Sequence, residues 1–371
     1  MPDVSRWLAE LEDDRENRQV AWGWQAWVQL GDAVVVDDAR GIDGVRRPLT
    51  PDSLHRLYCV GRPFTAVAVA TLVEAGRIGF ETRLGDIVDG LENRALADVT
   101  VAQLLCHRSG LHGIGAGAFA VMRESERTDA VLQFEPRDPG APVGIYDEYL
   151  GWRLLGLIVD EVSGGSWRDY VRDAVLVPMG LEHEVFPGFD AEQFTANSER
   201  LAVNVDLTPE TPVAMLGDAT ELVARQAEPA VGVYSSMRGL GRFYAALRGC
   251  MLGTAAPSSI LTRATLEQMA APATERGWDP LMERECAYGL GFMVGLRDQY
   301  FGTRVSDDAF GHGGFRDYGG FYDPAHDLVV AIQYVGLVHV DRSEALRRDE
   351  RFDLLYECLG LAPAEDYESV S

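Results

Sequence analysis

The pattern of apolar positions begins with two short segments that favour a sheet. Residues 20–30 are rich in aromatic and β-branched side chains, Gly31 and Asp32 follow, and residues 33–37 are again mostly β-branched. Two such segments around a tight Gly-containing turn predict a β-hairpin. We therefore expect the chain to open with two antiparallel strands.

The next apolar segment has the composition of a buried helix. Pro63 stands where the first turn of a helix accepts proline, residues 64–75 are apolar nearly all round, and Gly76 offers a C-terminal stop. A helix that is apolar on every side lies inside a protein. We expect a core helix here.

The remaining patterns separate a helical region from a second strand-rich region. Between residues 84 and 227, Gly- and Pro-bearing loops such as 137–142 break the helical patterns. Short β-rich runs then lead to a terminal helix, over residues 291–294, 319–322, 328–334 and 342–359. The predicted fold class is α/β (α+β), an antiparallel sheet flanked by helices with an inserted mainly helical subdomain. We expect the sheet subdomain over 1–76 and 285–371, and the helical one over 77–284.

Composition narrows the class of protein. The chain of 371 residues has 58 acidic and 33 basic side chains, a net charge of −25. This balance argues against nucleic acid or an anionic membrane as partner, because both require basic patches. Acidic runs such as residues 10–16 predict solvated faces. Residues 1–7 do not open a secretory signal, and five unpaired cysteines fit a reducing compartment, so we expect a cytoplasmic protein.

One octapeptide carries the strongest chemical signal. It is Cys59-Val60-Gly61-Arg62-Pro63-Phe64-Thr65-Ala66. This run resembles the Ser-x-x-Lys-Pro-Phe-Thr-Ala motif of serine β-lactamase-like hydrolases and penicillin-binding proteins, in which Ser attacks an acyl carbonyl and Lys helps to remove its proton. Cys59 takes the Ser position and Arg62 the Lys position. All 33 basic residues are arginine, so composition alone accounts for Arg62, but arginine keeps its proton and cannot act as the base.

Further segments carry the same resemblance in the same order, from about Leu57 to Val335. The segment 104–111 is similar to Leu-Leu-Thr-His-x-Ser-Gly-Leu, and the run from Gly311 to Phe315 stands in place of the Lys-Thr-Gly or His-x-Gly strand. Supporting matches lie at residues 151–158, 177–181, 231–236 and 288–291. The resemblance is to the class C β-lactamase, esterase and transacylase branch. It implies a β-lactamase/transpeptidase-like fold whose two subdomains form one catalytic domain.

The Tyr-x-Asn motif of that family is the main departure. Tyr146-Asp147-Glu148 reads like it with Glu for Asn, but the spacing to Gly156 is one residue too long for an ungapped match. In the family this tyrosine exchanges a proton with nucleophile and leaving group. We assign that role to Tyr146, and Tyr149 is the competing candidate.

The start of a buried helix suits an anionic sulfur at Cys59. The helix dipole and free backbone N–H groups favour a negative charge there, and Arg62 adds a fixed positive charge one turn on. Together they favour a thiolate without a lysine base. The alternative is that Cys59 is an ordinary buried small residue.

The resemblance also implies roles around the nucleophile. His312 would hydrogen-bond the tyrosine or orient the substrate. The oxyanion hole would come from the backbone N–H groups of Cys59 and Phe315. Substrate would lie against Gly313 and Gly314, and the remaining substrate-binding residues would be Glu148 and Tyr149.

These residues predict an acyltransferase that forms an acyl-Cys59 intermediate and passes the acyl group to an amine or alcohol, and we expect this reaction in natural-product assembly. A hydrolase acting on an ester, amide or peptide with the same site, and a catalytically inactive binding protein, are the alternatives. No phosphate loop, Gly-x-Ser-x-Gly turn or zinc spacing occurs, so we expect neither cofactor nor metal. The expected partners are a small-molecule acyl donor and acceptor, and the oligomeric state stays open.

Overall fold

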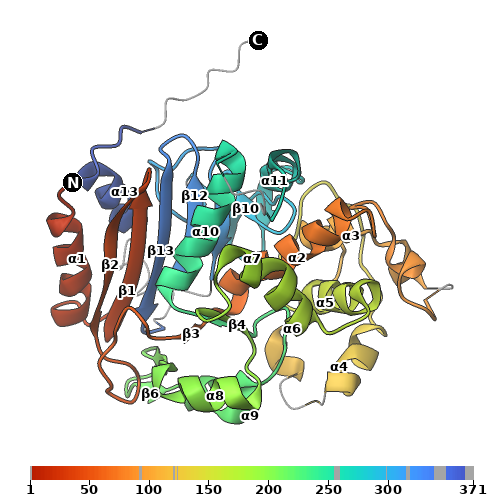
Figure 1. Ribbon diagram of the computed structural model, residues 1–371, viewed down its shortest axis with the longest axis horizontal. Coiled ribbons are helices and arrows are strands. Elements are labelled where there is room, and N and C mark those ends of the chain that lie inside the picture. Colours follow the sequence, from red (N-terminus) through yellow and green to blue (C-terminus); the bar gives the residue numbers. More distant parts are fainter. Residues whose placement is uncertain are drawn as a thin grey trace, which may run out of the picture.

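The two ends of the chain form one antiparallel sheet. The computed structural model describes residues 2–91, 94–119, 122, 124–254, 260–297, 299–314, 318–337 and 348–363. The six strands of the sheet lie in the order β10-β11-β12-β13-β1-β2 (Figure 1). Their bounds are β1 Gly23–Leu30, β2 Ala33–Gly41, β10 Met293–Val294, β11 Phe310–Gly313, β12 Tyr318–Asp323 and β13 Leu328–Val335. The predicted hairpin and C-terminal strands are confirmed. Because β1 pairs with β13 from Gly23↔Val335 to Leu30↔Leu328, the first hairpin completes a sheet begun by the last strands.

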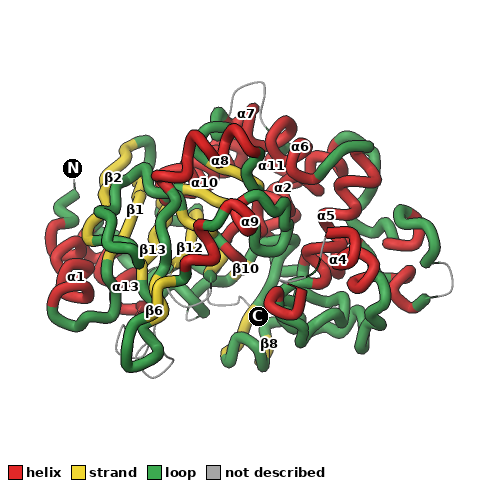
Figure 2. The backbone as a smooth tube through the Cα atoms, turned by 90° about the horizontal axis from the view of Figure 1, so that it is seen from below, coloured by secondary structure: helices red, strands yellow, loops and turns green. Residues whose placement is uncertain are grey.

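The two faces of this sheet are covered by helices from different parts of the chain (Figure 2). Side chains alternate across a strand, so Trp24 and Trp27 of β1 lie on opposite faces. Trp24 Nε1 donates to Glu12 Oε1 of α1 (Ser5–Glu16) at 2.8 Å. Trp27 instead packs under α10 (Met237–Leu252), where a Cβ on Gly241 would lie 2.1 Å from its ring. Glycine is therefore required where α10 crosses β1.

Helix α1 corrects one expectation from the sequence. The acidic run at 10–16 was expected to be a solvated face, but Asp14 is fully buried. It pairs with Arg351 of α13 (Arg348–Cys358), through Nε at 2.7 Å and Nη2 at 2.6 Å. This bidentate pair lets α1 and α13 pack together on one face of the sheet. Residues 342–347 of the predicted terminal helix lie outside the described part of the chain.

The expected core helix is α2 (Arg62–Glu74), which is buried along most of its length. It packs against α5 (Leu150–Ser163) on one side and against β11 on the other. The remaining helices are α3 Val101–Leu105, α4 Glu124–Val131, α6 Trp167–Tyr170, α7 Val177–Met179, α8 Ala191–Asn197, α9 Glu221–Ala224 and α11 Arg263–Ala270, with a π-helical turn at Val171–Leu176. The small strands are β3 His55–Arg56, β4 Val185–Pro187, β5 Val205–Asp206, β6 Val213–Ala214, β7 Val233–Ser235, β8 Gly277–Asp279 and β9 Arg284–Cys286. Helix α2 thus lies between the sheet and the helical region. The proposed subdomain boundaries stay a prediction. Helix α10 falls within 77–284 in sequence, but it packs on the sheet.

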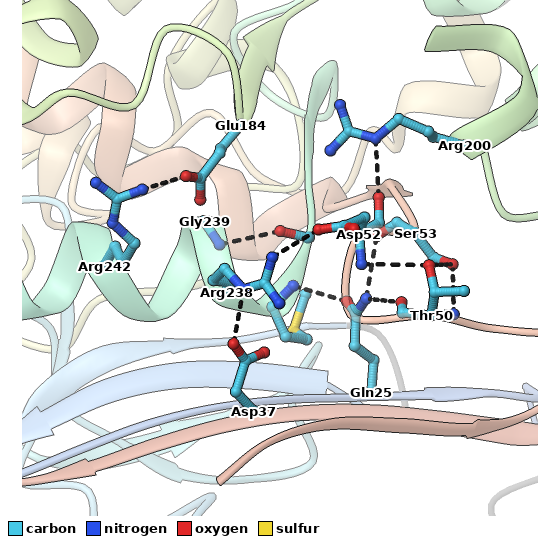
Figure 3. A network of polar contacts seen from close by, with 12 residues as sticks. Gln25, Asp37, Thr50, Asp52, Ser53, Glu184, Arg200, Arg238, Gly239 and Arg242 are labelled. Atoms are coloured by element: carbon cyan, nitrogen blue, oxygen red, sulfur yellow. Dashed lines mark hydrogen bonds and ion pairs between the residues drawn. The ribbon is translucent and has the colours of Figure 1, made fainter. Parts of the chain in front are cut away.

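A polar network fixes the loop that leads into the core helix (Figure 3). Gln25 of β1 donates through Nε2 to Thr50 O at 2.7 Å and to Ser53 O at 3.2 Å, and its Oε1 accepts from Met237 N at 2.7 Å. Arg238 of α10 bonds Asp37 and Asp52, and so bridges β2 to the same loop. The chain is therefore held by β1, β2 and α10 just before β3 and α2.

The described residues contain neither a membrane-spanning helix nor a cluster of metal-ligating side chains. No helix among them is both long and apolar enough to cross a membrane. In the same part of the chain, no group of three or more His, Cys, Asp or Glu side chains is placed to hold a metal ion.

Candidate active site

Cys59 lies in a 3₁₀ turn, Tyr58–Gly61, directly before α2. This turn packs against β7, β11 and β12. A Cβ on Gly61 would lie 2.7 Å from Val233, so the turn fits closely against β7. Cys59 itself is half-buried and touches the main core cluster on one side. Cys59 therefore contacts the core and is partly exposed, in a turn that packs against the strand that carries His312.

The residue before the cysteine is held in an uncommon backbone conformation. Tyr58 has φ +48°, and a non-glycine residue there costs about 1–3 kcal/mol. Its hydroxyl donates to Asp218 Oδ2 at 2.5 Å, and Arg56 Nη1 bonds Asp218 Oδ1 at 2.9 Å. Asp218 is buried, so these bonds fix the backbone just before Cys59. Nothing in the local sequence at Asp218, which follows Cys59 by more than 150 residues, marks it for this role.

Arg62, three residues after the cysteine, is fully buried. Its Nε donates to Ala230 O at 3.2 Å and its Nη2 to Glu148 O, while the guanidinium carbon lies 4.8 Å from the ring centre of Tyr146. Burial opposes its charge, but Cys59 and the neighbouring acidic groups outweigh burial and raise the pKa of Arg62. Arg62 is thus a permanent cation that holds backbone carbonyls and a tyrosine ring.

The two competing tyrosines point to different partners. Tyr146 interacts with Cys59 and its ring lies beside the guanidinium of Arg62, and burial raises the pKa of Tyr146 well above its usual range although Arg62 lowers it. The Tyr146 hydroxyl therefore keeps its proton. The hydroxyl of Tyr149 donates instead to Glu228 Oε2 at 2.8 Å, and the same oxygen lies 3.3 Å from Arg127 Nη1. The structure brings Tyr146 to the cysteine and Tyr149 to a separate buried cluster.

His312 lies in β11 with its ring centre 6.2 Å from that of Tyr146. Its Nδ1 is 2.6 Å from Gly313 O, so Nδ1 carries the proton, and its Nε2 has no hydrogen-bond partner in the described structure. Burial, helped by Arg62, lowers the pKa of His312 to about 3. The imidazole is therefore neutral, and of its two expected roles this geometry favours orienting a ligand over bonding the tyrosine.

The glycines after His312 lie against an aromatic side chain. A Cβ on Gly313 would lie 2.2 Å from the ring of Tyr300, and Gly314 O accepts a hydrogen bond from the Tyr300 hydroxyl. Tyr300 therefore occupies the space beside Gly313. Phe315, expected to complete the oxyanion hole, lies outside the described residues.

The segment that replaces Tyr-x-Asn is fixed through its backbone. Glu148 stands in the Asn position, and its main-chain oxygen, not its side chain, accepts from Arg62. Its half-buried carboxylate lies 3.1 Å from where a Cβ on Gly115 would be. The Asp147 carboxylate accepts from the N–H groups of Tyr149 and Leu150 at 2.9 Å each, and so caps α5. Burial raises the pKa of Asp147 to about 6.

Comparison with known proteins agrees with this architecture. A family model described as Beta-lactamase matches residues 8–354, so the chain belongs to that family. Penicillin-binding protein 4 of Amycolatopsis lactamdurans is 33% identical over 148 residues, 37% of this chain and 37% of that protein. The chain thus aligns with little more than a third of that relative's length.

Two solved structures cover nearly the whole chain. A family VIII carboxylesterase superposes with a TM-score of 0.80 at 20% identity, covering 96% of this chain and 98% of the esterase. EstCE1, described as a hydrolase with promiscuous acyltransferase activity, superposes with a TM-score of 0.76 at 16% identity, covering 94% and 98%. The predicted mixed fold, with its antiparallel sheet and helices, is confirmed.

Proposed function

We propose that the protein is an acyltransferase that carries the acyl group on Cys59. The observation behind this proposal is that Tyr146, held beside Arg62, interacts with a half-buried cysteine at the start of α2. Arg62 supplies a fixed positive charge that interacts with both side chains. A thiol, a proton carrier and a cation are the parts that nucleophilic acyl transfer needs, and no lysine base is required.

The proposed reaction has two steps. In the first, the Cys59 sulfur attacks the donor carbonyl, a C–S bond forms, and the bond to the leaving group breaks as Tyr146 relays the thiol proton to that group. In the second, an amine or alcohol attacks the thioester, the C–S bond breaks, and the acceptor's proton returns through Tyr146 to the sulfur. Neutral His312 would accept a hydrogen bond from the incoming acceptor through Nε2.

Transfer is proposed over hydrolysis on chemical grounds. A thioester is relatively more susceptible to amines than to water, so replacing serine by cysteine favours an amine acceptor. EstCE1 shows that an enzyme with this fold can have acyltransferase activity beside hydrolysis. We place the reaction in natural-product assembly, where acyl exchange between small molecules is common.

Intact-mass spectrometry with thioester and aryl-ester acyl donors tests the proposal. We expect one acyl group per chain, and none on Cys59→Ala. The chain contains no lysine, so non-specific acylation of side-chain amines cannot obscure the result. Acylation of Cys59→Ala to the wild-type level, or no acylation of the wild type by any donor, contradicts the proposal. Cys358→Ala removes another half-buried cysteine and is the matched control.

An esterase is the second candidate, favoured by the superposition on a family VIII carboxylesterase. The same acyl-enzyme would then be released by water. Product analysis with and without an added amine separates the two. An unchanged yield of free acid in the presence of amine favours the esterase.

A further inference from the structure

We propose that Asp279 is a positioning residue that keeps Tyr146 within reach of Cys59. The proposal rests on the acyl-transfer function proposed above. Asp279 ends β8, in a hairpin with β9 that is far from the nucleophile in sequence. Neither the family motifs nor the local sequence point to it.

The Asp279 carboxylate is fully buried, and its hydrogen bonds explain where Tyr146 lies. Its Oδ2 accepts from Tyr146 N at 2.6 Å and from the Tyr288 hydroxyl at 2.7 Å. Its Oδ1 accepts from the backbone N–H groups of Leu281 at 2.9 Å and Met282 at 3.2 Å. One carboxylate thus ties the hairpin turn to the backbone of the tyrosine that interacts with Cys59.

A second route from Asp279 reaches the Tyr146 side chain. The Tyr288 ring, held by Asp279, lies 4.6 Å from the His107 ring, and that ring lies 4.7 Å from the Tyr146 ring. His107 Nδ1 also accepts from Asp147 N at 2.9 Å. Two consecutive backbone N–H groups, at 146 and 147, are therefore held by side chains from distant segments. Both the backbone and the ring of Tyr146 are constrained.

This constraint matters for chemistry because the Tyr146 hydroxyl must meet both the sulfur and the leaving group. A displacement of about 1 Å in a reacting group costs roughly 100-fold in rate. Asp279→Asn keeps the size of the side chain but turns one acceptor oxygen into an N–H donor. One of the four groups that donate to Asp279 then loses its acceptor. The Tyr146 segment would then shift relative to Cys59.

The experiment compares Asp279→Asn with Asp323→Asn. Asp323 is also fully buried and also accepts from a tyrosine hydroxyl, Tyr356, at 2.6 Å and from a backbone N–H, Ser306, at 3.1 Å. Asp323 is the last residue of β12 and pairs with Leu328 of β13, whereas Gly313 pairs with Gly319 near the other end of β12. We expect Asp279→Asn to slow acylation of Cys59 by about tenfold or more, with the donor KM within about threefold. Asp323→Asn should stay near the wild-type rate.

A double variant separates positioning from general destabilisation. If Asp279 acts through Tyr146, adding Asp279→Asn to Tyr146→Phe should slow acylation no further. Effects that multiply in the double variant overturn the proposal, and so does an Asp279→Asn enzyme that acylates like the wild type. Tyr288→Phe removes only one donor from the cluster, so it serves if Asp279→Asn does not fold. It should slow acylation in the same direction, and an unchanged rate would count against the proposal.

Alkylation by iodoacetamide provides a readout that needs no acyl donor. The ratio of labelled Cys59 to labelled Cys358 reports the surroundings of Cys59, with an internal control in the same chain. We expect Tyr146→Phe, Asp279→Asn and the double variant to change this ratio by a similar factor. If no donor acylates the wild type, the acyl-transfer function fails, and this ratio still decides the role of Asp279. A wild-type ratio in Asp279→Asn overturns that role.

Discussion

Tyr146 and Tyr149 are three residues apart, yet they belong to different clusters. Tyr146 interacts with the half-buried Cys59 beside the cation of Arg62. Tyr149 donates to Glu228, whose carboxylate is also paired with Arg127. In the first cluster a tyrosine meets a half-buried cysteine. In the second, a tyrosine closes a buried ion-pair cluster.

This comparison shows that burial and a raised pKa do not identify which tyrosine takes part in the reaction. Burial raises the pKa of both hydroxyls above the usual range of tyrosine. What separates them is the partner, a sulfur in one case and a carboxylate in the other. We therefore expect substitutions in the first cluster to change rate and those in the second to change stability.

The largest expected effect is on acylation in Tyr146→Phe. Losing the hydroxyl removes the proposed proton relay, so the single-turnover acylation rate should fall by about 100-fold. Quenched-flow mass spectrometry measures it. Tyr149→Phe is the matched control and should acylate within about threefold of the wild type. A larger loss in Tyr149→Phe than in Tyr146→Phe would reverse the assignment.

Arg62→Gln should affect both rate and stability. It removes the buried cation from beneath Cys59 and weakens the bonds to two backbone carbonyls, so we expect acylation to slow about tenfold and the free energy of unfolding to fall by about 3 kcal/mol. Urea denaturation measures the second effect. Arg248→Gln, which breaks a pair with Asp327 in the turn between β12 and β13, should lose stability alone. Full acylation by Arg62→Gln would show that the cation has no part in the reaction.

Tyr149→Phe should lower stability with little change in rate. Its hydroxyl is a partner of a buried carboxylate, and removing such a bond costs about 2 kcal/mol. Glu228→Gln tests the same cluster from the other side, because a neutral amide no longer balances Arg127. Urea midpoints identical to the wild type in both variants would mean that this cluster is not structural.

The smallest expected effect is a pH slope from Asp147, which lies between the two tyrosines. Its pKa of about 6 in the folded chain lies above the ordinary value of 3.8, so the folded state binds its proton more tightly. Its contribution to stability is fully present below pH 3.8 and is lost as pH rises through about 6, with a slope of about 1 kcal/mol per pH unit. Urea denaturation between pH 4 and 7 measures it. Asp147→Asn should flatten the slope, and an unchanged slope contradicts the assignment.

The sequence predicted the sheet and the core helix because their signals are local. The Gly31-Asp32 turn and the all-round apolar run after Pro63 both act within a dozen residues. The acidic run in α1 misled because Asp14 pairs with Arg351, at the other end of the chain, as well as with Arg18 one turn on. A local pattern contains Arg18 but not the distant partner that packs over the carboxylate.

The candidate site also contains residues that the sequence predicted and residues that it did not. The family motif placed Cys59, Arg62 and His312 near one another, since its segments keep their order around the fold. The choice between Tyr146 and Tyr149 needed side-chain directions at the start of α5. Asp218 and Asp279 were not predicted, because their roles come from hydrogen bonds across more than 100 residues.

Peptide mapping of the trapped acyl-enzyme tests the central claim most directly. After brief reaction with a thioester donor and acid quenching, we expect the acyl group on the peptide that contains Cys59, released by hydroxylamine as a thioester is. An acyl group found on another residue, Cys358 or a hydroxyl, with the Cys59 peptide unmodified, would contradict the account.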